Sequence, residues 1–490
     1  MDKIKFLKIN PLDNVAIALE DLPKDFVANG IRLKEDILRG HKYSLTAITD
    51  KSPVVKYGYP IGVAKGDIEA GAWVHSHNLK SALGGLEEYN YTPKLPPTPV
   101  PAEGSFNGYQ RSDGEVGIRN ELWIIPTVGC VNKTAELLAR DYKITAPGVD
   151  GVFVFTHPYG CSQLGEDHET TQHILANLVR HPNAGGVLVL GLGCENNTLE
   201  SFKKVIGEID PERVKFMVTQ EVSDEIASGK IILNELEKHA AKAKRTPCPL
   251  SKLKVGLKCG GSDGFSGITA NPLLGSFSDM LIEYGGTSVL TEVPEMFGAE
   301  TILMERCRSK KIFDKCVDMV NGFKEYFISH NQVVYENPSP GNKEGGITTL
   351  EEKSLGCTQK GGAGIVEDVL DHTERLKRPG LNLLSGPGND IVAVTALAAA
   401  GAHMVLFTTG RGTPLGGPAP TIKVSTNNEL AEFKKNWIDF NAGTLLTGET
   451  MPEATQRLMK RVIATANGEA TCSEKNGYRE IAIFKDGVTL

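Results

Sequence analysis

The sequence predicts an α/β protein in which a small all-β domain precedes larger domains built on mostly parallel sheets. Residues 1–90 contain short segments of alternating polar and apolar residues, separated by Gly, Pro and Asp, which is typical of strands joined by tight turns. From residue 106 onward, apolar runs are each followed by a segment of helical length. Parallel strands covered by helices on both faces produce this alternation.

The N-terminal strands are expected at residues 14–19, 43–48, 54–57 and 60–64. Because turn residues separate these short segments, we predict a β domain that ends near residue 90. Five prolines follow within residues 91–105. Proline favours extended backbone, so we interpret this stretch as a semi-rigid linker.

The main α/β domain is expected to run from residue 106 to residue 360, with a further α/β portion at residues 361–490. Its candidate strands are 122–125, 152–155, 187–190, 215–218, 254–257 and 288–290. Its helices are expected at 133–140, 170–180, 199–209, 221–241 and 271–284. In the C-terminal portion, the clearest strand is 404–407 and the clearest helix is 429–440.

Composition and charge exclude several classes of protein. The chain has 490 residues, of which 40% are hydrophobic and 23% charged, as expected for a globular protein with more than one core. A formal net charge of −7 offers no general attraction for nucleic acid. No apolar run reaches the roughly 18 residues that span a membrane, and the N-terminus has no signal-peptide pattern. We therefore expect a cytoplasmic protein that binds a small molecule.

Four of the nine cysteines lie just past a predicted strand: Cys130, Cys161, Cys194 and Cys259. Because the carboxyl ends of parallel strands meet at one edge of a sheet, we expect these thiols to lie close together. Soft thiolates suit an iron–sulfur cluster or a thiolate-bound iron. The alternative is that each is a small buried side chain. There is no Cys-x-x-Cys pair, and both interpretations stay open.

His75 and His77 are a second set of candidate metal ligands. Residues two apart on a strand project from the same face, so both imidazoles could bind one divalent metal. One could also bind the metal while the other transfers a proton. The alternative is a polar strand end that carries two solvated histidines.

A glycine-rich segment at residues 258–267 indicates a ligand-binding loop. Successive glycines expose backbone N–H groups to an anion, while Ser262, Asp263 and the later Asn271 are suited to bind hydroxyls. The segment has neither the Gly-x-Gly-x-x-Gly order of dinucleotide-binding proteins nor the Gly-Lys-Ser/Thr end of a phosphate-binding loop. A nucleotide-dependent enzyme is therefore disfavoured.

Two polar loops offer arginines for an acidic ligand. Arg411 follows the strand at 404–407, and Arg111 and Arg119 lie with Asn120 in the glycine-flanked segment 108–120. A guanidinium binds a carboxylate through two hydrogen bonds, although each of these arginines could instead form a structural salt bridge. Glu292 follows the strand at 288–290 and is a candidate acid or base.

Six motifs occur in a characteristic order: residues 108–120, 159–161, 191–195, 259–263, 337–342 and 408–414. In these motifs the sequence resembles the altronate/galactarate dehydratase family, and the resemblance extends over essentially the whole chain. Residues 1–85, with His75-Ser76-His77-Asn78, resemble the N-terminal SAF (β-clip) domain of that family.

The resemblance implies a hydro-lyase of sugar-acid catabolism that requires Fe2+ or Mn2+. Within that family, the paired-histidine form of residues 75–78 resembles the members that act on altronate more than those that act on galactarate, which implies a hexonate substrate, D-altronate, and the products 2-dehydro-3-deoxy-D-gluconate and water. Galactarate dehydration is the alternative. A sulfolactate sulfo-lyase type of elimination and a non-catalytic sugar-acid-binding protein are further ones.

Dehydration requires a base, an acid and a group that stabilises negative charge on the carboxylate. We expect His75 and His77 to bind metal or carry protons, and Asp263 and Glu292 to act as acid or base. The expected substrate-binding residues are Arg111, Arg119, Asn120, Ser262, Asn271 and Arg411. Since these segments are far apart in the sequence, the β domain must dock over the sheet edge, which allows for a homo-oligomer with a site between subunits.

Overall fold

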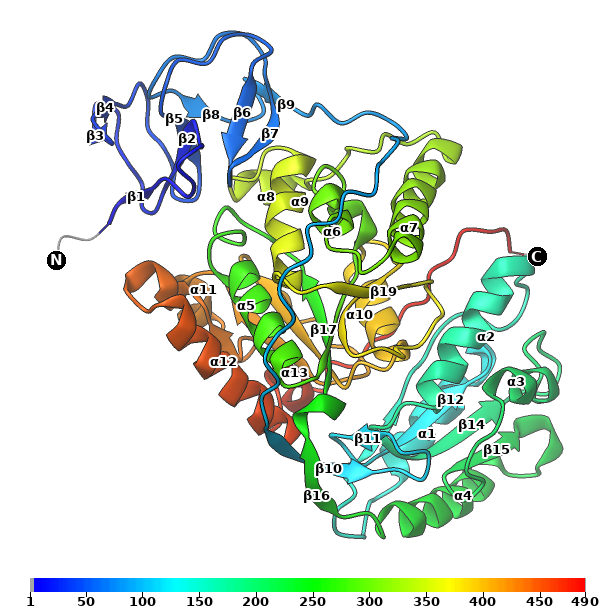
Figure 1. Cartoon of the computed structure of the whole chain (residues 1–490). Coiled ribbons are helices and arrows are strands. Elements are labelled where there is room, and N and C mark those ends of the chain that lie inside the picture. Colours follow the sequence, from blue (N-terminus) through cyan, green and yellow to red (C-terminus); the bar gives the residue numbers. More distant parts are fainter. Residues whose placement is uncertain (1–3, 490) are drawn as a thin grey trace.

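The computed structural model describes residues 4–489 and has three parts: an N-terminal β domain and two domains with parallel sheets (Figure 1). The expected order of a β domain followed by α/β structure is confirmed. Within residues 4–489, no helix is both long and apolar enough to cross a membrane.

The β domain consists of short antiparallel strands. One sheet contains β1 (Phe6–Leu7), β2 (Val15–Ala18), β5 (Lys42–Ser44) and β8 (Trp73–Val74). A second contains β6 (Pro53–Lys56), β7 (Tyr59–Ala64) and β9 (Leu79–Lys80), and β3 (Val27–Ala28) pairs with β4 (Ile31–Arg32). Apolar side chains such as Val54, Ile61 and Val74 pack between the sheets and are fully buried.

Residues 81–104 are extended and run along the C-terminal domain, where the Lys94 and Ala102 N–H groups donate to the carbonyls of Glu305 and Glu283. A three-stranded antiparallel sheet then joins the two α/β domains. It contains β10 (Ser105–Gln110), β11 (Val116–Gly117) and β16 (Arg245–Pro249).

The second domain has a four-stranded parallel sheet in the order β13 (Val152–Val154), β12 (Glu121–Pro126), β14 (Ala184–Gly191), β15 (Val214–Val218). Its helices are α1 (Asn132–Asp141), α2 (Gly165–Val179), α3 (Leu199–Ile206) and α4 (Glu225–Ala240). Trp123 and Ile125 contribute to the core on one face, whereas Leu122 and Ile124 contribute to the core on the other. Burial on both faces explains why β12 is apolar without alternation.

The C-terminal domain has a seven-stranded sheet in which all pairs are parallel. The order is β19 (Val366–Leu370), β20 (Gly380–Leu384), β18 (Thr287–Leu290), β17 (Lys254–Cys259), β21 (Met404–Thr409), β22 (Thr421–Ser425), β23 (Phe440–Asn441). Its helices are α5 (Ala270–Glu283), α6 (Glu300–Met304), α7 (Lys310–Ser329), α8 (Pro340–Glu344), α9 (Leu350–Thr358), α10 (Asp390–Ala399), α11 (Asn428–Phe433), α12 (Met451–Ala466) and α13 (Cys472–Lys475).

The expected division of the α/β region at residue 360 is wrong. β20 pairs directly with β18, so strands on both sides of residue 360 belong to one sheet. The sheets divide instead between β15 and β17. The helix expected at 429–440 is also shorter, since α11 ends at Phe433.

The chain's last described residues return to the second domain. Ile483 is buried in the core beside α2, and the N–H groups of Asp486 and Gly487 donate to the Asp167 carboxylate, both at 2.8 Å. Thr489 pairs with Gln163. Figure 1 shows this tail running to the start of α2.

A buried carboxylate fixes the β domain to the C-terminal domain. Glu352 of α9 accepts hydrogen bonds from Lys42 and Lys56, both at 2.8 Å, and the three side chains are at most 3% exposed. Burial alone would disfavour the carboxylate, but the two ammonium groups lower the pKa of Glu352 to about 2. The pKa of Lys42 falls to about 8 because the group is buried.

We expect Glu352→Gln to lower the free energy of unfolding by about 3–5 kcal/mol, because it leaves two buried ammonium groups without a carboxylate. Chemical denaturation of this variant, of a control variant and of the parent measures the change. The matched control is Glu200→Gln, which removes an exposed pair with Lys204 and should change stability by less than about 1 kcal/mol. Equal transitions for both variants would show that the domains are held by other contacts.

Candidate functional site

A cleft of about 400 Å³ lies where the β domain meets the C-terminal domain. The β domain contributes Arg39, and the C-terminal domain contributes Asp263 and Phe265 from the glycine-rich loop. The remaining lining residues are Gly345, Gly410, Arg411, Asn427, Glu429, Leu430 and Phe433. The cleft therefore combines two carboxylates, Asp263 and Glu429, with two guanidinium groups.

Two histidines of the β domain hold the α8 segment against this cleft. His41 Nε2 donates to the carbonyl oxygen of Glu344 at 3.1 Å, and His75 Nε2 donates to that of Lys343 at 3.0 Å. Burial, and then the charge of Lys42, lower the pKa of His75 to about 4, so it is neutral at pH 7. A neutral imidazole that donates through Nε2 has one acceptor position, Nδ1, which lies 3.1 Å from the Ser76 hydroxyl.

His77, unlike His75, is exposed. The Trp73 ring contacts both imidazoles, with centroid distances of 5.0 Å to His75 and 5.1 Å to His77. To bind a metal, His75 would have to give up its contact with Ser76. A shared metal site at the two histidines stays a prediction.

Asp263 is buried at the cleft and is surrounded by donors. It accepts hydrogen bonds from the hydroxyls of Ser266 and Thr426, the Asn427 amide and the Phe265 N–H, at 2.9–3.2 Å. Burial raises the pKa of Asp263, and these donors oppose the rise. The neighbouring Ser262 hydroxyl is buried, and within residues 4–489 it has no hydrogen-bond partner. A buried hydroxyl without a partner is suited to bind a ligand.

The two guanidinium groups of the cleft are paired only with exposed carboxylates. Arg411 lies 3.1 Å from Glu344, and its side chain is 47% exposed; Arg39 lies 2.8 Å from Glu429. Exposed ion pairs contribute little stability, so a ligand carboxylate can replace these partners. Arg39 is not among the site residues expected from the sequence, because only the docking of the β domain brings it to the site.

Behind the glycine-rich loop lies a buried group of charges at the carboxyl ends of β17 and β18. Glu292 pairs with Lys258 and Lys360, and Glu295 pairs with Lys353 at 2.9 Å. Glu292 also has a left-handed backbone with φ of 72°, a strained conformation that is common at functional sites. Because Glu292 is buried and doubly paired, its expected role as acid or base requires an opening of this core.

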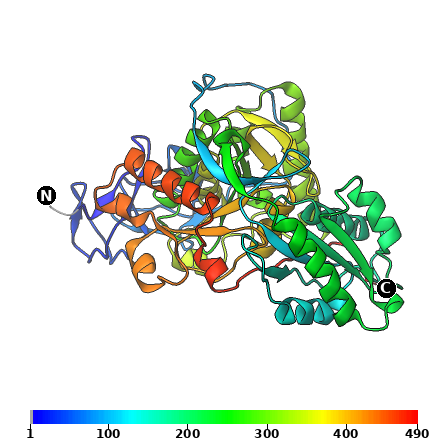
Figure 2. The ribbon, with the colours of Figure 1, turned by 90° about the horizontal axis from the view of Figure 1, so that it is seen from below.

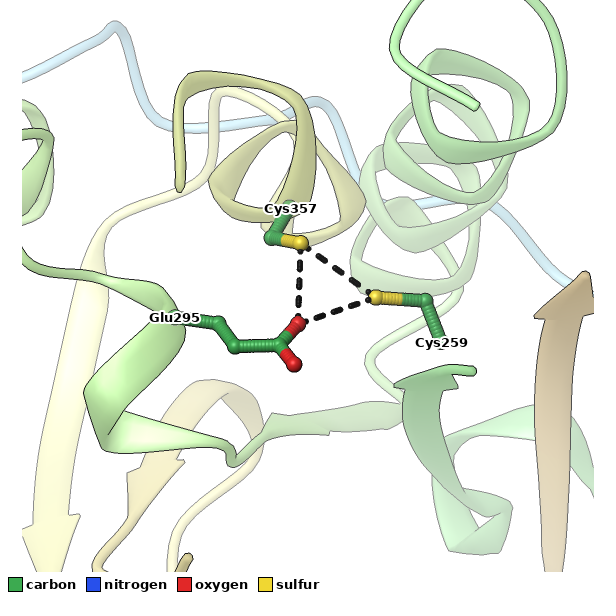
Figure 3. Close-up of side chains that lie close together, drawn as sticks. All are labelled: Cys259, Glu295 and Cys357. Carbon is green, nitrogen blue, oxygen red and sulfur yellow. Dashed lines mark hydrogen bonds between the residues drawn. The ribbon is translucent and has the colours of Figure 1, made fainter. Parts of the chain in front are cut away.

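Cys259, Glu295 and Cys357 meet within the same charged core (Figure 3). The two sulfurs are 3.3 Å apart, and Glu295 Oε2 lies 3.4 and 3.1 Å from them. However, the Lys360 ammonium is 2.9 Å from the Cys259 sulfur, and Lys353 pairs with Glu295. The protein's own cations thus occupy the positions next to these ligands, which does not fit a bound metal ion.

Three family models match the chain in sequence order. Residues 4–82 match the altronate/galactarate dehydratase SAF domain, and residues 108–241 match the D-galactarate dehydratase/altronate hydrolase second domain. Residues 250–489 match the D-galactarate/altronate dehydratase C-terminal domain. The chain belongs to the altronate/galactarate dehydratase family.

Three relatives in this dehydratase family match nearly the whole chain. The altronate dehydratase of Escherichia coli is 57% identical, and the alignment covers 99% of this chain and 100% of that relative's chain. That of Bacillus subtilis is 56% identical over 99% of both chains. The galactarate dehydratase (L-threo-forming) of E. coli is 34% identical, with 98% of this chain and 96% of its own covered.

Several residues that the sequence predicts to bind a sugar acid form structural contacts within the protein instead. The Arg111 guanidinium donates to the Asn120 side chain and to the carbonyls of Pro182 and Arg119. Arg119 pairs with Glu474 of α13 at 2.8 Å. Asn271 bonds to Thr408 and to the Gly356 carbonyl, inside the core. The substrate-binding role is therefore corrected for Arg111, Arg119, Asn120 and Asn271, whose polar groups are already satisfied by the protein.

The prediction that the four thiols lie close together is also wrong. Cys259 is buried at the end of β17 in the seven-stranded sheet. Cys130, Cys161 and Cys194 are exposed and follow β12, β13 and β14 of the four-stranded sheet. The sequence does not reveal that the parallel strands divide between two sheets.

Folding lowers the pKa of His75 from 6.5 to about 4. Between pH 4 and pH 6.5, the unfolded chain therefore binds a proton at this residue more readily than the folded protein does. We expect stability to fall as the pH drops from 6.5 to 4, and His75→Asn to reduce that loss by up to about 3 kcal/mol. Denaturation of parent and variant at pH 7 and pH 4.5 measures the difference. His77→Asn is the matched control, and an equal pH dependence in parent and His75→Asn would show that His75 is not held neutral.

Proposed function

We propose that the chain dehydrates D-altronate to 2-dehydro-3-deoxy-D-gluconate and water. The observation that carries this proposal is the 56–57% identity to two altronate dehydratases over 99% of the chain. The galactarate dehydratase is a more distant relative, at 34% identity.

The reaction removes the proton from C2 of the hexonate and the hydroxyl from C3, and the resulting enol becomes a 2-keto acid. The C2 proton is weakly acidic. The site must therefore supply a base, a proton for the leaving hydroxyl and positive charge next to the carboxylate.

The cleft supplies the base and the positive charge in one place. Arg39 and Arg411 bind the substrate carboxylate, and their positive charge stabilises the enediolate. Asp263 takes the C2 proton, since burial raises its pKa towards the pH of the reaction. A volume of about 400 Å³ is within the usual range for small-molecule sites.

His41 and His75 position the site rather than enter the chemistry. By holding the carbonyls of Glu344 and Lys343, they fix α8, whose Gly341 carbonyl accepts a hydrogen bond from Arg411 at 3.2 Å. His77 is exposed beside Trp73 and is the histidine that we assign to carry a proton.

A requirement for Fe2+ or Mn2+ is part of the proposal. When bound, the ion supplies a Lewis acid for the carboxylate and the leaving hydroxyl. His77 would bind the ion in place of carrying a proton, whereas His75 would have to give up a ring hydrogen bond to become a ligand.

To test the function, iron-treated protein is incubated with D-altronate, its hexonate epimers and galactarate while 2-keto acid formation is followed. We expect the highest kcat/KM with D-altronate, loss of turnover with a chelator and recovery with Fe2+. Faster turnover of galactarate would contradict the substrate assignment, and full turnover without metal would contradict the iron requirement.

Substitutions at Asp263 and Arg411 should differ in kind. Asp263→Asn removes the base while keeping the side chain's size, so kcat should fall by about 10²–10⁴-fold. Arg411→Ala should chiefly raise KM, since it removes binding common to the substrate and the transition state.

Arg308→Ala is the matched control for Arg411→Ala, because Arg308 is an exposed arginine that pairs with Glu367 and does not line the cleft. Thermal transitions check that each variant folds. An Asp263→Asn variant with parental kcat would place the base elsewhere.

A further inference from the structure

Three exposed cysteines lie at one edge of the four-stranded sheet. Cys130, Cys161 and Cys194 each follow a strand of this sheet, on the loops after β12, β13 and β14. The other six cysteines are buried or partly buried. Cysteine is among the residues most often found in protein interiors, so three exposed thiols on neighbouring loops need an explanation.

Buried polar side chains bind the three loops together. Asn197, on the Cys194 loop, donates from its side chain to the Thr127 carbonyl at 3.1 Å and from its backbone to the Gly160 carbonyl at 2.9 Å. Glu195 accepts from the Thr127 hydroxyl at 2.7 Å and from the Gly193 N–H at 2.6 Å. Both side chains are at most 4% exposed.

The loops that carry Cys130 and Cys161 are also in direct backbone contact. Gly160 has a φ of +98°, and a Cβ atom there would lie 1.9 Å from the Thr127 carbonyl oxygen, so only glycine fits. The Gly129 N–H donates to the Tyr159 carbonyl at 2.8 Å. The chain therefore places each cysteine within three residues of one rigid junction.

The spacing of the three thiols does not suit one metal ion. Two sulfurs bound to a single zinc-sized ion at about 2.3 Å are separated by at most about 4.6 Å. Within residues 4–489, the one group of three possible ligand atoms that all lie within 4.8 Å of one another is Cys259, Glu295 and Cys357. At least one pair among Cys130, Cys161 and Cys194 is thus farther apart than two ligands of one such ion.

We propose that Cys130, Cys161 and Cys194 bind an iron–sulfur cluster through their thiolates. With three cysteine ligands, one iron of a four-iron cluster keeps a coordination position for an oxygen ligand. The proposed dehydration transfers no electrons, so such an iron would act as a Lewis acid on a hydroxyl or carboxylate of a sugar acid. This role rests on the proposed function, whereas the presence of the cluster does not.

The cluster site is a second centre, separate from the cleft. Thr489, near the end labelled C in Figure 1, pairs with Gln163. Gln163 lies two residues beyond Cys161, so this label marks the edge of the four-stranded sheet that carries the cysteines. Figures 1 and 2 both show the second domain and the β domain on opposite sides of the molecule.

The test is to purify the full chain without oxygen and to measure iron, acid-labile sulfide and the visible absorption spectrum. The variants are Cys130→Ser, Cys161→Ser and Cys194→Ser, with Cys472→Ser, a partly exposed cysteine on α13, as the matched control. The parent and Cys472→Ser should contain iron and sulfide in similar amounts and absorb in the visible range. The three other variants should lose most of both while still unfolding in a single cooperative transition, at a lower temperature because the bound cluster no longer stabilises the fold.

Iron without sulfide in the parent, or full iron and sulfide in the three variants, would overturn the proposal. Dehydration of D-altronate is measured on the same preparations to separate the two proposals. Turnover by a chain that contains no sulfide would refute the cluster's role in the dehydration and leave the function standing. A cluster in a chain that dehydrates no hexonate would do the reverse.

Discussion

The ion pairs of Glu352 with Lys42 and Lys56 are the constraint on which the site depends. The β domain contributes both lysines, and α9 contributes the carboxylate. Once this contact has placed the β domain, His41 and His75 reach the carbonyls of α8, and Arg39 reaches the cleft. Buried ion pairs between two domains tolerate little movement, because a small displacement of one domain leaves a buried charge unpaired. The orientation of the β domain is therefore sharply defined.

The fold class could be predicted because the strands of both sheets are apolar on two faces. The run at 122–125 became β12, and the run at 404–407 became β21. Helix α9 could not be found in this way. All nine of its residues are buried, including Glu351, Glu352 and Lys353, so it lacks the amphipathic pattern of a surface helix. Its charges are tolerated because partners from distant segments meet them.

The candidate site was predictable where local sequence determines the geometry. The glycine-rich loop and Arg411 are at the cleft because each follows a strand of one sheet. Arg39 was missed and Arg111 was misassigned for the same physical reason: a guanidinium has the same chemistry at a cleft and in a core. Only the tertiary fold shows that carbonyls surround Arg111, whereas Arg39 faces an exposed carboxylate.

The C-terminal tail has a consequence for biosynthesis. The second domain lies in the first half of the sequence, yet its core includes Ile483, and its Asp167 binds the backbone of Asp486 and Gly487. Domains generally fold as the ribosome releases them, starting from the N-terminus. Here the four-stranded sheet emerges early, but the core beside it remains incomplete until residues 483–487 have been translated. The nascent chain must then carry an open apolar surface while the whole C-terminal domain is being made.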